Sequence, residues 1–266
     1  MREMQIALGR FRLTGMGDGY DVVVRAGALD ELGPALRARG LAGPLSLVTD
    51  VNVGGHYAFR ALQSLRGAGY RSRAVFLSPG EKNKNMVAVQ KLWDAFLEAD
   101  VERGSTVVAL GGGVVGDLAG FAAASFLRGV SWVNVPTSLL AMVDASIGGK
   151  TGVDLPQGKN LVGAFHAPRL VWVDTDVLST LPEVELRNGL AEVVKHGVIG
   201  DLTSFQNLTG LDGNLSGLDW STLVRRALAV KVGVVQADPY EQGVRASLNF
   251  GHTIGHAVEL ASGFSL

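Results

Sequence analysis

The sequence contains no cysteine, which excludes disulfide bonds and thiolate metal sites, so any metal must be bound by histidine, aspartate or glutamate. It has no excess of charge, because 24 basic and 25 acidic residues give a formal net charge of −1. This balance argues against a nucleic-acid partner. No apolar run approaches the roughly 20 residues of a membrane helix, and the first residues lack the apolar core of a signal peptide. We therefore expect a cytoplasmic protein with no membrane partner.

Glycine is abundant, with 36 residues, which implies many turns and close backbone approaches. Hydrophobic residues make up 47% of the chain, enough for a substantial core. A length of 266 residues suits one large domain or two modest ones.

The first two thirds of the sequence alternate between short β-branched runs and helical patterns. The expected strands are Tyr20–Arg25, Leu45–Val48, Arg73–Leu77, Thr106–Leu110, Trp132–Val135 and Leu170–Val173. This alternation predicts a mostly parallel sheet that is covered by helices on both faces. The residues Met1–Gly19 are ambiguous and could be partly disordered.

From Pro182 onward the pattern becomes helical, over Leu186–Ile199, Trp220–Gln236 and Val244–Ala261. We expect an α/β, Rossmann-like domain over residues 1–181 and an all-α domain over residues 182–266.

The region 105–160 carries the strongest signals. The strand Thr106–Leu110 ends in Gly111–Gly113, and a helix that includes Asp117 follows. Free backbone N–H groups and the positive end of the helix dipole could bind a diphosphate there, although many such turns are only tight connections.

Other polar segments, such as Asp50–Asn52 and Gly80–Lys84, also follow predicted strands. Because ligands bind at the carboxyl ends of parallel strands, we expect these segments to converge on one crevice.

Two histidines, His252 and His256, lie four residues apart on the last predicted helix. They could bind a metal, serve as one ligand and one acid–base group, or be capping or core residues. Asn249 lies about one helical turn before His252, and Arg245 about one turn before Asn249. This stripe of polar residues favours a functional site over a structural role.

Glu192 and Lys195 form a second pair, which would be a weak surface ion pair if the helix were exposed. The apolar neighbours predict instead a helix that is buried nearly all round, where an unpaired carboxylate is costly. Glu192 and His252 would then be two ligands of Zn²⁺ or Co²⁺, while His196 is interpreted as structural.

Several cations stand in apolar or glycine-rich surroundings. They could be solvated surface charges, but together they would suit a ligand with phosphate and carboxylate groups. They are Arg128, Lys150, Lys159, Lys231 and Arg245.

Four segments resemble the successive motifs of the 3-dehydroquinate synthase family, in the family's order: GGGVVGDLAGFAAASFLRG, VPTSLLAMVDASIGGKTGVDLPQGKNLVGAFH, GLAEVVKHGVI and LNFGHTIGHAVE. The resemblance implies conversion of 3-deoxy-D-arabino-heptulosonate 7-phosphate, a sugar-acid phosphate, to 3-dehydroquinate and phosphate. It also implies a dehydroquinate synthase-like fold, NAD that is restored in each turnover, and Zn²⁺ or Co²⁺.

The resemblance also implies roles for individual residues. The NAD-binding set would be Gly80, Glu81, Lys82, Asn83, Lys84, Gly113, Val114, Val115, Gly116, Asp117, Thr137, Ser138, Lys150, Lys159, Leu178, Ser179 and Thr180. The metal ligands would include Glu192 and His252. The substrate-binding and catalytic set would be Asp144, Lys150, Asn160, Lys195, Lys231, Arg245, Asn249 and His256. Arg128 resembles an arginine that a neighbouring subunit lends to the phosphate, which implies a homodimer.

The sequence departs from the family pattern in lacking an HGEAV-like motif with a third metal ligand and a C-terminal lysine that contacts phosphate. We therefore expect a truncated C-terminal domain and little or no turnover. The alternatives are an impaired NAD-binding fragment, a cyclase acting on sedoheptulose 7-phosphate or forming an inosose, and a metal- and NAD-dependent polyol dehydrogenase.

Overall fold

A central seven-stranded sheet organises the computed structural model, which describes residues 2–210, 213, 215 and 217–261. The strand order is β1-β2-β9-β6-β5-β3-β4, and only the pairing of β1 with β2 is antiparallel. The strands are β1 (Arg10–Leu13), β2 (Tyr20–Val24), β3 (Leu45–Asp50), β4 (Ser72–Leu77), β5 (Thr106–Gly111), β6 (Ser131–Pro136) and β9 (Leu170–Val173). All six strands expected from the sequence are therefore present.

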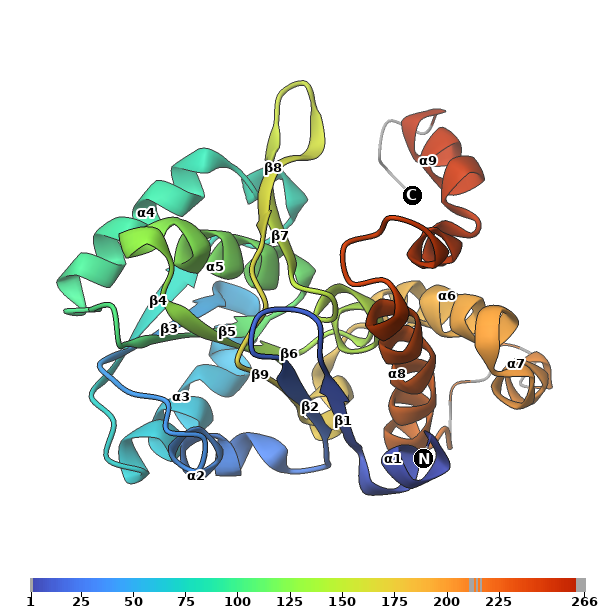
Figure 1. Ribbon diagram of the computed structural model, residues 1–266, viewed down its shortest axis with the longest axis horizontal. Coiled ribbons are helices and arrows are strands. Elements are labelled where there is room, and N and C mark those ends of the chain that lie inside the picture. Colours follow the sequence, from blue (N-terminus) through green and yellow to red (C-terminus); the bar gives the residue numbers. More distant parts are fainter. Residues whose placement is uncertain (1, 211–212, 214, 216, 262–266) are drawn as a thin grey trace.

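Helices cover both faces of this sheet (Figure 1). The helices α2 (Leu32–Arg37) and α3 (Val51–Gly67) lie on one face, and α4 (Met86–Glu98) and α5 (Gly113–Ser125) lie on the other. Every residue of β3 and β5 is buried, as expected for strands that are enclosed on both sides.

The N-terminal segment, which the sequence left ambiguous, has regular secondary structure in its described part. It forms α1 (Arg2–Leu8) and β1, in which Phe11 and Leu13 are buried while their neighbours are exposed. Arg225 of α8 (Trp220–Ala237) donates hydrogen bonds to the carbonyl groups of Ala7 and Val24. The start of the chain therefore packs against the helical region near its end.

Residues 150–165, where no strand was expected, form a hairpin of β7 (Lys150–Leu155) and β8 (Gly158–Phe165). Gly152 and Gly163 face each other across the hairpin, and the Cβ of any larger residue at either position would collide with the opposite backbone. The glycines therefore permit close pairing of strands. The hairpin stands away from the main sheet (Figure 1).

Beyond residue 181 the described residues form helices and no strand, as expected. The helices are α6 (Glu183–Gly200), α7 (Leu202–Thr209), α8, a 3₁₀ helix over Val244–Asn249 and α9 (His252–Ala261). The expectation of one helix over Val244–Ala261 is wrong. Gly251, with φ +85°, adopts a left-handed conformation that separates the 3₁₀ helix from α9.

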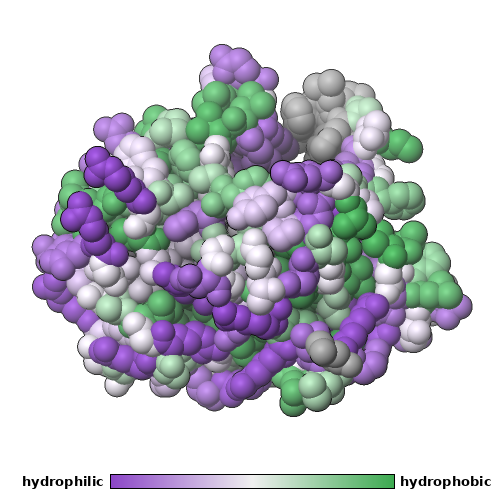
Figure 2. All heavy atoms as spheres, in the orientation of Figure 1, coloured by the Kyte–Doolittle hydropathy of each residue, from purple (hydrophilic) through white to green (hydrophobic). Residues whose placement is uncertain are grey.

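Helix α6 is not buried all round, contrary to the sequence-based expectation. Val184, Val194 and Val198 are 62%, 38% and 50% exposed, whereas Lys195 and His196 of the same helix are buried. Figure 2 shows hydrophobic surface gathered at the right, over this helical region. Among the described residues, no helix is long and apolar enough to cross a membrane.

Candidate active site

A cavity of about 620 Å³ lies between the β7–β8 hairpin and the helical region. Eight residues that the sequence nominated as substrate or metal ligands line it together: Asp144, Lys150, Asn160, Lys195, Lys231, Arg245, Asn249 and His252. The first and last of them are more than 100 residues apart in the sequence, so it is the fold that brings these side chains together. Asp117, from the predicted NAD set, also lines this cavity.

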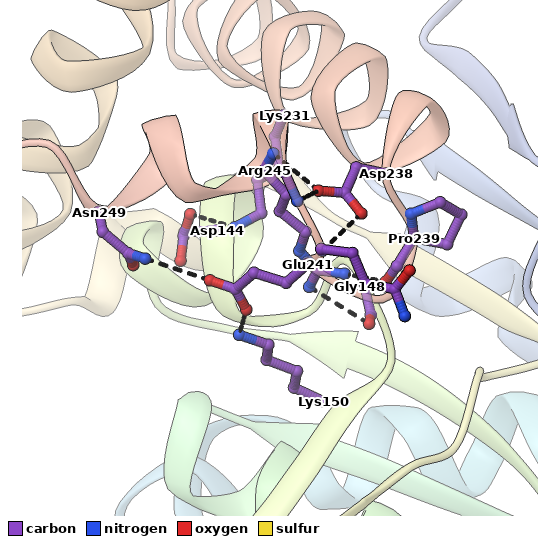
Figure 3. A network of polar contacts seen from close by, with 11 residues as sticks. Asp144, Gly148, Lys150, Lys231, Asp238, Pro239, Glu241, Arg245 and Asn249 are labelled. Carbon is purple, nitrogen blue, oxygen red and sulfur yellow. Dashed lines mark hydrogen bonds and ion pairs between the residues drawn. The ribbon is translucent and has the colours of Figure 1, made fainter.

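Asp144 is the hub of the cavity. Its Oδ1 lies 2.6 Å from the ammonium group of Lys231 and 4.0 Å from that of Lys195. Burial alone would raise the pKa of Asp144, but Lys231, His196 and Lys195 together hold it well below its usual range. Burial lowers the pKa of Lys231, although Asp144 opposes this effect. The result is a carboxylate that stays ionised next to buried amines, of which Figure 3 shows Lys231.

Glu192 and Lys195 form an ion pair within α6. Their side chains are only 15% and 7% exposed, so the interpretation as a surface ion pair is wrong. Lys195 thus presents a buried ammonium group to both Glu192 and Asp144.

His196, interpreted from the sequence as structural, contributes to the same cluster. It is fully buried, and its Nε2 lies 3.5 Å from Asp144 Oδ1. Asp144, Glu192 and His196 offer ligand atoms that all lie within 4.8 Å of one another, a group that fits a divalent cation. The predicted ligand His252 lines the cavity, whereas the side chain of the predicted catalytic residue His256 lies outside the described part of the chain.

The loop after α8 fixes Arg245. The Asp238 carboxylate accepts hydrogen bonds from the backbone N–H groups of Gln242, Gly243 and Arg245, at 2.8, 2.7 and 3.1 Å. These bonds hold the pKa of Asp238 below its usual value. The Arg245 guanidinium donates to the carbonyl group of Pro239, and Arg245 is only 3% exposed (Figure 3). Arg245 is therefore pre-positioned at the cavity wall.

Glu241 is a cavity residue that the sequence analysis missed. Its carboxylate pairs with Lys150 and accepts a hydrogen bond of 3.1 Å from Asn249 Nδ2 (Figure 3). Burial would raise the pKa of Glu241, but Lys150 and Asn249 hold it below its usual value. Its φ of +59° is uncommon for a residue other than glycine and often marks a functional position. The one feature of the sequence that could have indicated Glu241 was its position close to Arg245.

The predicted NAD segments lie at the carboxyl edge of the sheet. The Gly113–Asp117 segment forms the first turn of α5, and no side chain caps this helix N-terminus. Ser138 Oγ lies beside Gly112, where an added Cβ would come within 3.4 Å of it, and the Thr137 N–H donates to the Gly111 carbonyl group. The backbone N–H groups at this end of α5 suit an anionic ligand.

Lys84 joins the Gly80–Lys84 turn to its surroundings. Its ammonium group lies 2.6 Å from Asp117 Oδ2, 2.6 Å from Asn160 Oδ1 and 3.6 Å from Glu81 Oε1. Burial would lower the pKa of Lys84, but Asp117 raises it above its usual value. Lys84 therefore connects a predicted NAD segment with the predicted substrate residue Asn160.

Another predicted NAD segment, Leu178–Thr180, follows β9. It belongs to a 3₁₀ helix, and Thr180 Oγ1 lies 2.7 Å from the hydroxyl group of Tyr57. Lys82 and Lys159 are exposed. Asp50, which was expected to contribute to the crevice, instead caps α3. Its carboxylate accepts hydrogen bonds from the backbone N–H groups of Asn52 and Val53.

Arg128 does not line the main cavity. It borders a second cavity of about 580 Å³ together with Arg103, His166 and Arg169. Its φ is +68°, so the turn that presents it has an unusual backbone conformation.

Comparison with known proteins identifies relatives of this chain. The family model described as 3-dehydroquinate synthase N-terminal matches residues 74–188, and the model described as 3-dehydroquinate synthase C-terminal matches residues 189–266. A 3-dehydroquinate synthase from Nostoc punctiforme is 48% identical over 253 residues, covering 93% of this chain and 69% of the relative. The enzyme from Symbiobacterium thermophilum is 50% identical over 254 residues, covering 92% of this chain and 70% of the relative.

Solved structures of similar fold include sugar phosphate cyclases. A 2-deoxy-scyllo-inosose synthase complexed with carbaglucose-6-phosphate, NAD⁺ and Co²⁺ matches with a TM-score of 0.85 and 28% identity, covering 95% of this chain and 70% of that one. The 2-epi-5-epi-valiolone synthase ValA from Streptomyces hygroscopicus, with NAD⁺ and Zn²⁺ bound, matches with a TM-score of 0.84 and 33% identity, covering 96% and 72%. A glycerol dehydrogenase from Schizosaccharomyces pombe, at 15% identity and a TM-score of 0.60, shares the fold alone.

Proposed function

This chain belongs to the 3-dehydroquinate synthase family, and we propose that it converts 3-deoxy-D-arabino-heptulosonate 7-phosphate to 3-dehydroquinate and inorganic phosphate. The observation that carries the proposal is the cavity in which Lys150, Lys195, Lys231 and Arg245 surround the carboxylates of Asp144 and Glu241. A substrate with both a phosphate and a carboxylate group needs several cations held in fixed positions.

The residues present fit both cofactors that the family implies. The uncapped N-terminus of α5 and the adjacent glycines suit the diphosphate of NAD. Glu192, with its buried carboxylate, and His252 suit Zn²⁺ or Co²⁺, with His196 and Asp144 close to Glu192. When bound, NAD supplies reversible hydride transfer, and the metal supplies polarisation of the substrate's alcohol oxygen.

The chain's own residues supply binding, orientation and proton transfer. Arg245, held by Asp238, is suited to a bidentate contact with carboxylate, and Lys150 and Lys195 are suited to bind phosphate or alkoxide oxygens. Asp144 keeps the buried Lys231 close to the reacting atoms. Glu241 stays ionised and faces the cavity, so it is suited to accept a proton from the substrate.

The sugar-acid substrate is favoured over those of other cyclases. Identity to the 3-dehydroquinate synthases described above is 48% and 50%, against 28% and 33% for the two other cyclases. A polyol dehydrogenase is disfavoured because its likeness is limited to the fold, and because four cations in one cavity suit a phosphorylated substrate.

We further propose two features of organisation. The first is a homodimer in which Arg128 reaches the substrate of the neighbouring subunit. Arg128 is exposed and does not line the main cavity of its own subunit, which supports this arrangement. The second is a division into an α/β unit over residues 1–181 and a helical unit over residues 182–266, supported by the absence of strands among the described residues after 181.

The experiment is a phosphate-release assay with NAD and Co²⁺ on protein of verified mass. Catalytic phosphate release from 3-deoxy-D-arabino-heptulosonate 7-phosphate, without net NADH, supports the proposal, whereas no release would agree with the expectation from the sequence of little or no turnover. Stoichiometric NADH formation would indicate a dehydrogenase, and release from sedoheptulose 7-phosphate alone would indicate another cyclase. Light scattering on the same sample tests the homodimer.

A further inference from the structure

We propose that the hydroxyl group of Tyr20 is a positioning group for the substrate cavity, because it holds the Gly148–Lys150 turn in the conformation that places Arg245 and Lys150. This inference rests on the proposed function, since it names a residue that supports the same site. Tyr20 does not line the cavity itself.

The contact is a buried hydrogen bond between distant parts of the chain. Tyr20 is the first residue of β2 and is fully buried, and the backbone N–H of Gly148 donates to its hydroxyl oxygen at 2.9 Å. Burial raises the pKa of Tyr20 to about 12, so the phenol remains neutral at physiological pH. A buried N–H that loses its acceptor carries a large desolvation cost, so this bond fixes the backbone at Gly148.

The Gly148 backbone in turn fixes Arg245. Gly148 and Gly149 have φ values of +101° and +63°, a conformation that glycine adopts without strain. The Arg245 guanidinium lies directly against Gly148: a Cβ at that position would collide with it, and its Nη2 lies 3.4 Å from the Gly148 carbonyl oxygen (Figure 3). A shift of the turn would therefore displace Arg245.

The same turn leads directly into Lys150. Lys150 begins β7 and pairs with Glu241, so its ammonium group is held between the hairpin and the loop after α8. Gly148 thus contacts Arg245 on one side and precedes Lys150 by two residues on the other. One hydrogen bond to Tyr20 therefore supports two of the cavity's cations.

The β1–β2 hairpin supports this region at two further points. Met16 is 2% exposed, and its Cε packs against Gly149, where an added Cβ would approach it to 2.9 Å. The Thr14 N–H donates to Gln236 Oε1 at 2.8 Å, close to the end of α8. The N-terminal hairpin therefore braces both the turn and the helix that precedes the Asp238 loop.

Nothing in the motifs singles out Tyr20. It lies well before residue 74, where the matching N-terminal family model begins, and its neighbours are ordinary strand residues. Its role follows only from the three-dimensional contact with Gly148.

The test compares Tyr20→Phe with Tyr70→Phe. Tyr70 is a matched control because it is 4% exposed and its hydroxyl donates to the Leu41 carbonyl group at 2.7 Å, away from the cavity. We expect Tyr20→Phe to raise KM for the sugar-acid phosphate about tenfold and to raise KM for NAD less, because Arg245 and Lys150 both belong to the predicted substrate set but only Lys150 belongs to the predicted NAD set. Hydrogen exchange of the amides in residues 146–150 should also accelerate. Tyr70→Phe should change none of these quantities.

The inference is overturned if Tyr20→Phe and Tyr70→Phe show equal KM for the sugar-acid phosphate and equal exchange in residues 146–150. A rise in KM for NAD as large as the rise in KM for the sugar-acid phosphate would also overturn it, because that result indicates general disruption. A wild-type chain that binds the sugar-acid phosphate without releasing phosphate contradicts the proposed function alone. In that case the dissociation constant replaces KM in the same comparison.

Discussion

Lys84 and Asn160 lie 76 positions apart in the sequence, yet the ammonium group of Lys84 donates a 2.6 Å hydrogen bond to Asn160 Oδ1. The same ammonium group pairs with Asp117. One buried cation thus ties the turn after β4, the start of α5 and the β7–β8 hairpin together.

Substitution of Lys84 should therefore destabilise the protein. We expect Lys84→Met to lower the free energy of unfolding by about 3 kcal/mol, because it leaves the Asp117 carboxylate largely buried without its partner. Urea denaturation measures this change. Lys91→Met, at an exposed position of α4, is the control, and a loss no larger than in that control would contradict the prediction.

Glu241→Gln should lower kcat by about 100-fold, since a neutral amide cannot accept a proton. The pKa of Glu241 lies below its usual value, so the wild type loses activity only as the pH falls through that pKa. The variant should lack this acidic limb of the pH–rate profile. Glu98→Gln, exposed at the end of α4, should behave as the wild type. An unchanged kcat in Glu241→Gln would exclude Glu241 as the base.

Asp144→Asn should remove a pH-dependent part of the stability. Because the folded-state pKa of Asp144 is depressed, its contribution is fully present above the unfolded-state value of about 4 and is lost as the pH falls through the folded-state pKa. The difference in unfolding free energy between wild type and variant should be constant from pH 8 to about 5 and shrink on further acidification. Asp100→Asn, in an exposed ion pair with Arg71, serves as the control. A difference that stays constant down to pH 2 would refute the prediction.

Metal binding should depend on Glu192 and His252. We expect Glu192→Gln and His252→Asn to lose most of the Co²⁺ that the wild type retains in equilibrium dialysis, whereas His56→Asn, at an exposed position of α3, should retain it. If His196→Asn loses Co²⁺ while His252→Asn keeps it, the ion is instead bound by Asp144, Glu192 and His196.

Local pattern was sufficient to predict six strands of the main sheet, but not β1 and its antiparallel pairing with β2. Strands such as Thr106–Leu110 are β-branched or apolar runs next to glycine turns, and the alternation with helices fixes a parallel arrangement. The convergence of Lys150, Lys231 and Arg245 was anticipated from the family motifs, and the cavity brings them together.

The errors occurred where tertiary contacts decide the local structure. The β7–β8 hairpin reads as a loop because Gly152 and Gly163 serve close strand pairing rather than a turn. The break at Gly251 was hidden by a helical pattern on both sides. Glu241 was missed because an isolated acidic residue in a loop has no periodic signal, and only its contacts with Lys150 and Asn249 reveal it.

The position of Asp144 at the centre of the cavity has a consequence for mutagenesis. Lys231, Lys195 and His196 all approach its Oδ1, so removal of any one changes the field felt by the other two. The effects of single substitutions at these residues will therefore not be additive, and double-mutant cycles are needed to separate them. A redesign of this cavity would therefore have to treat the four residues as one unit.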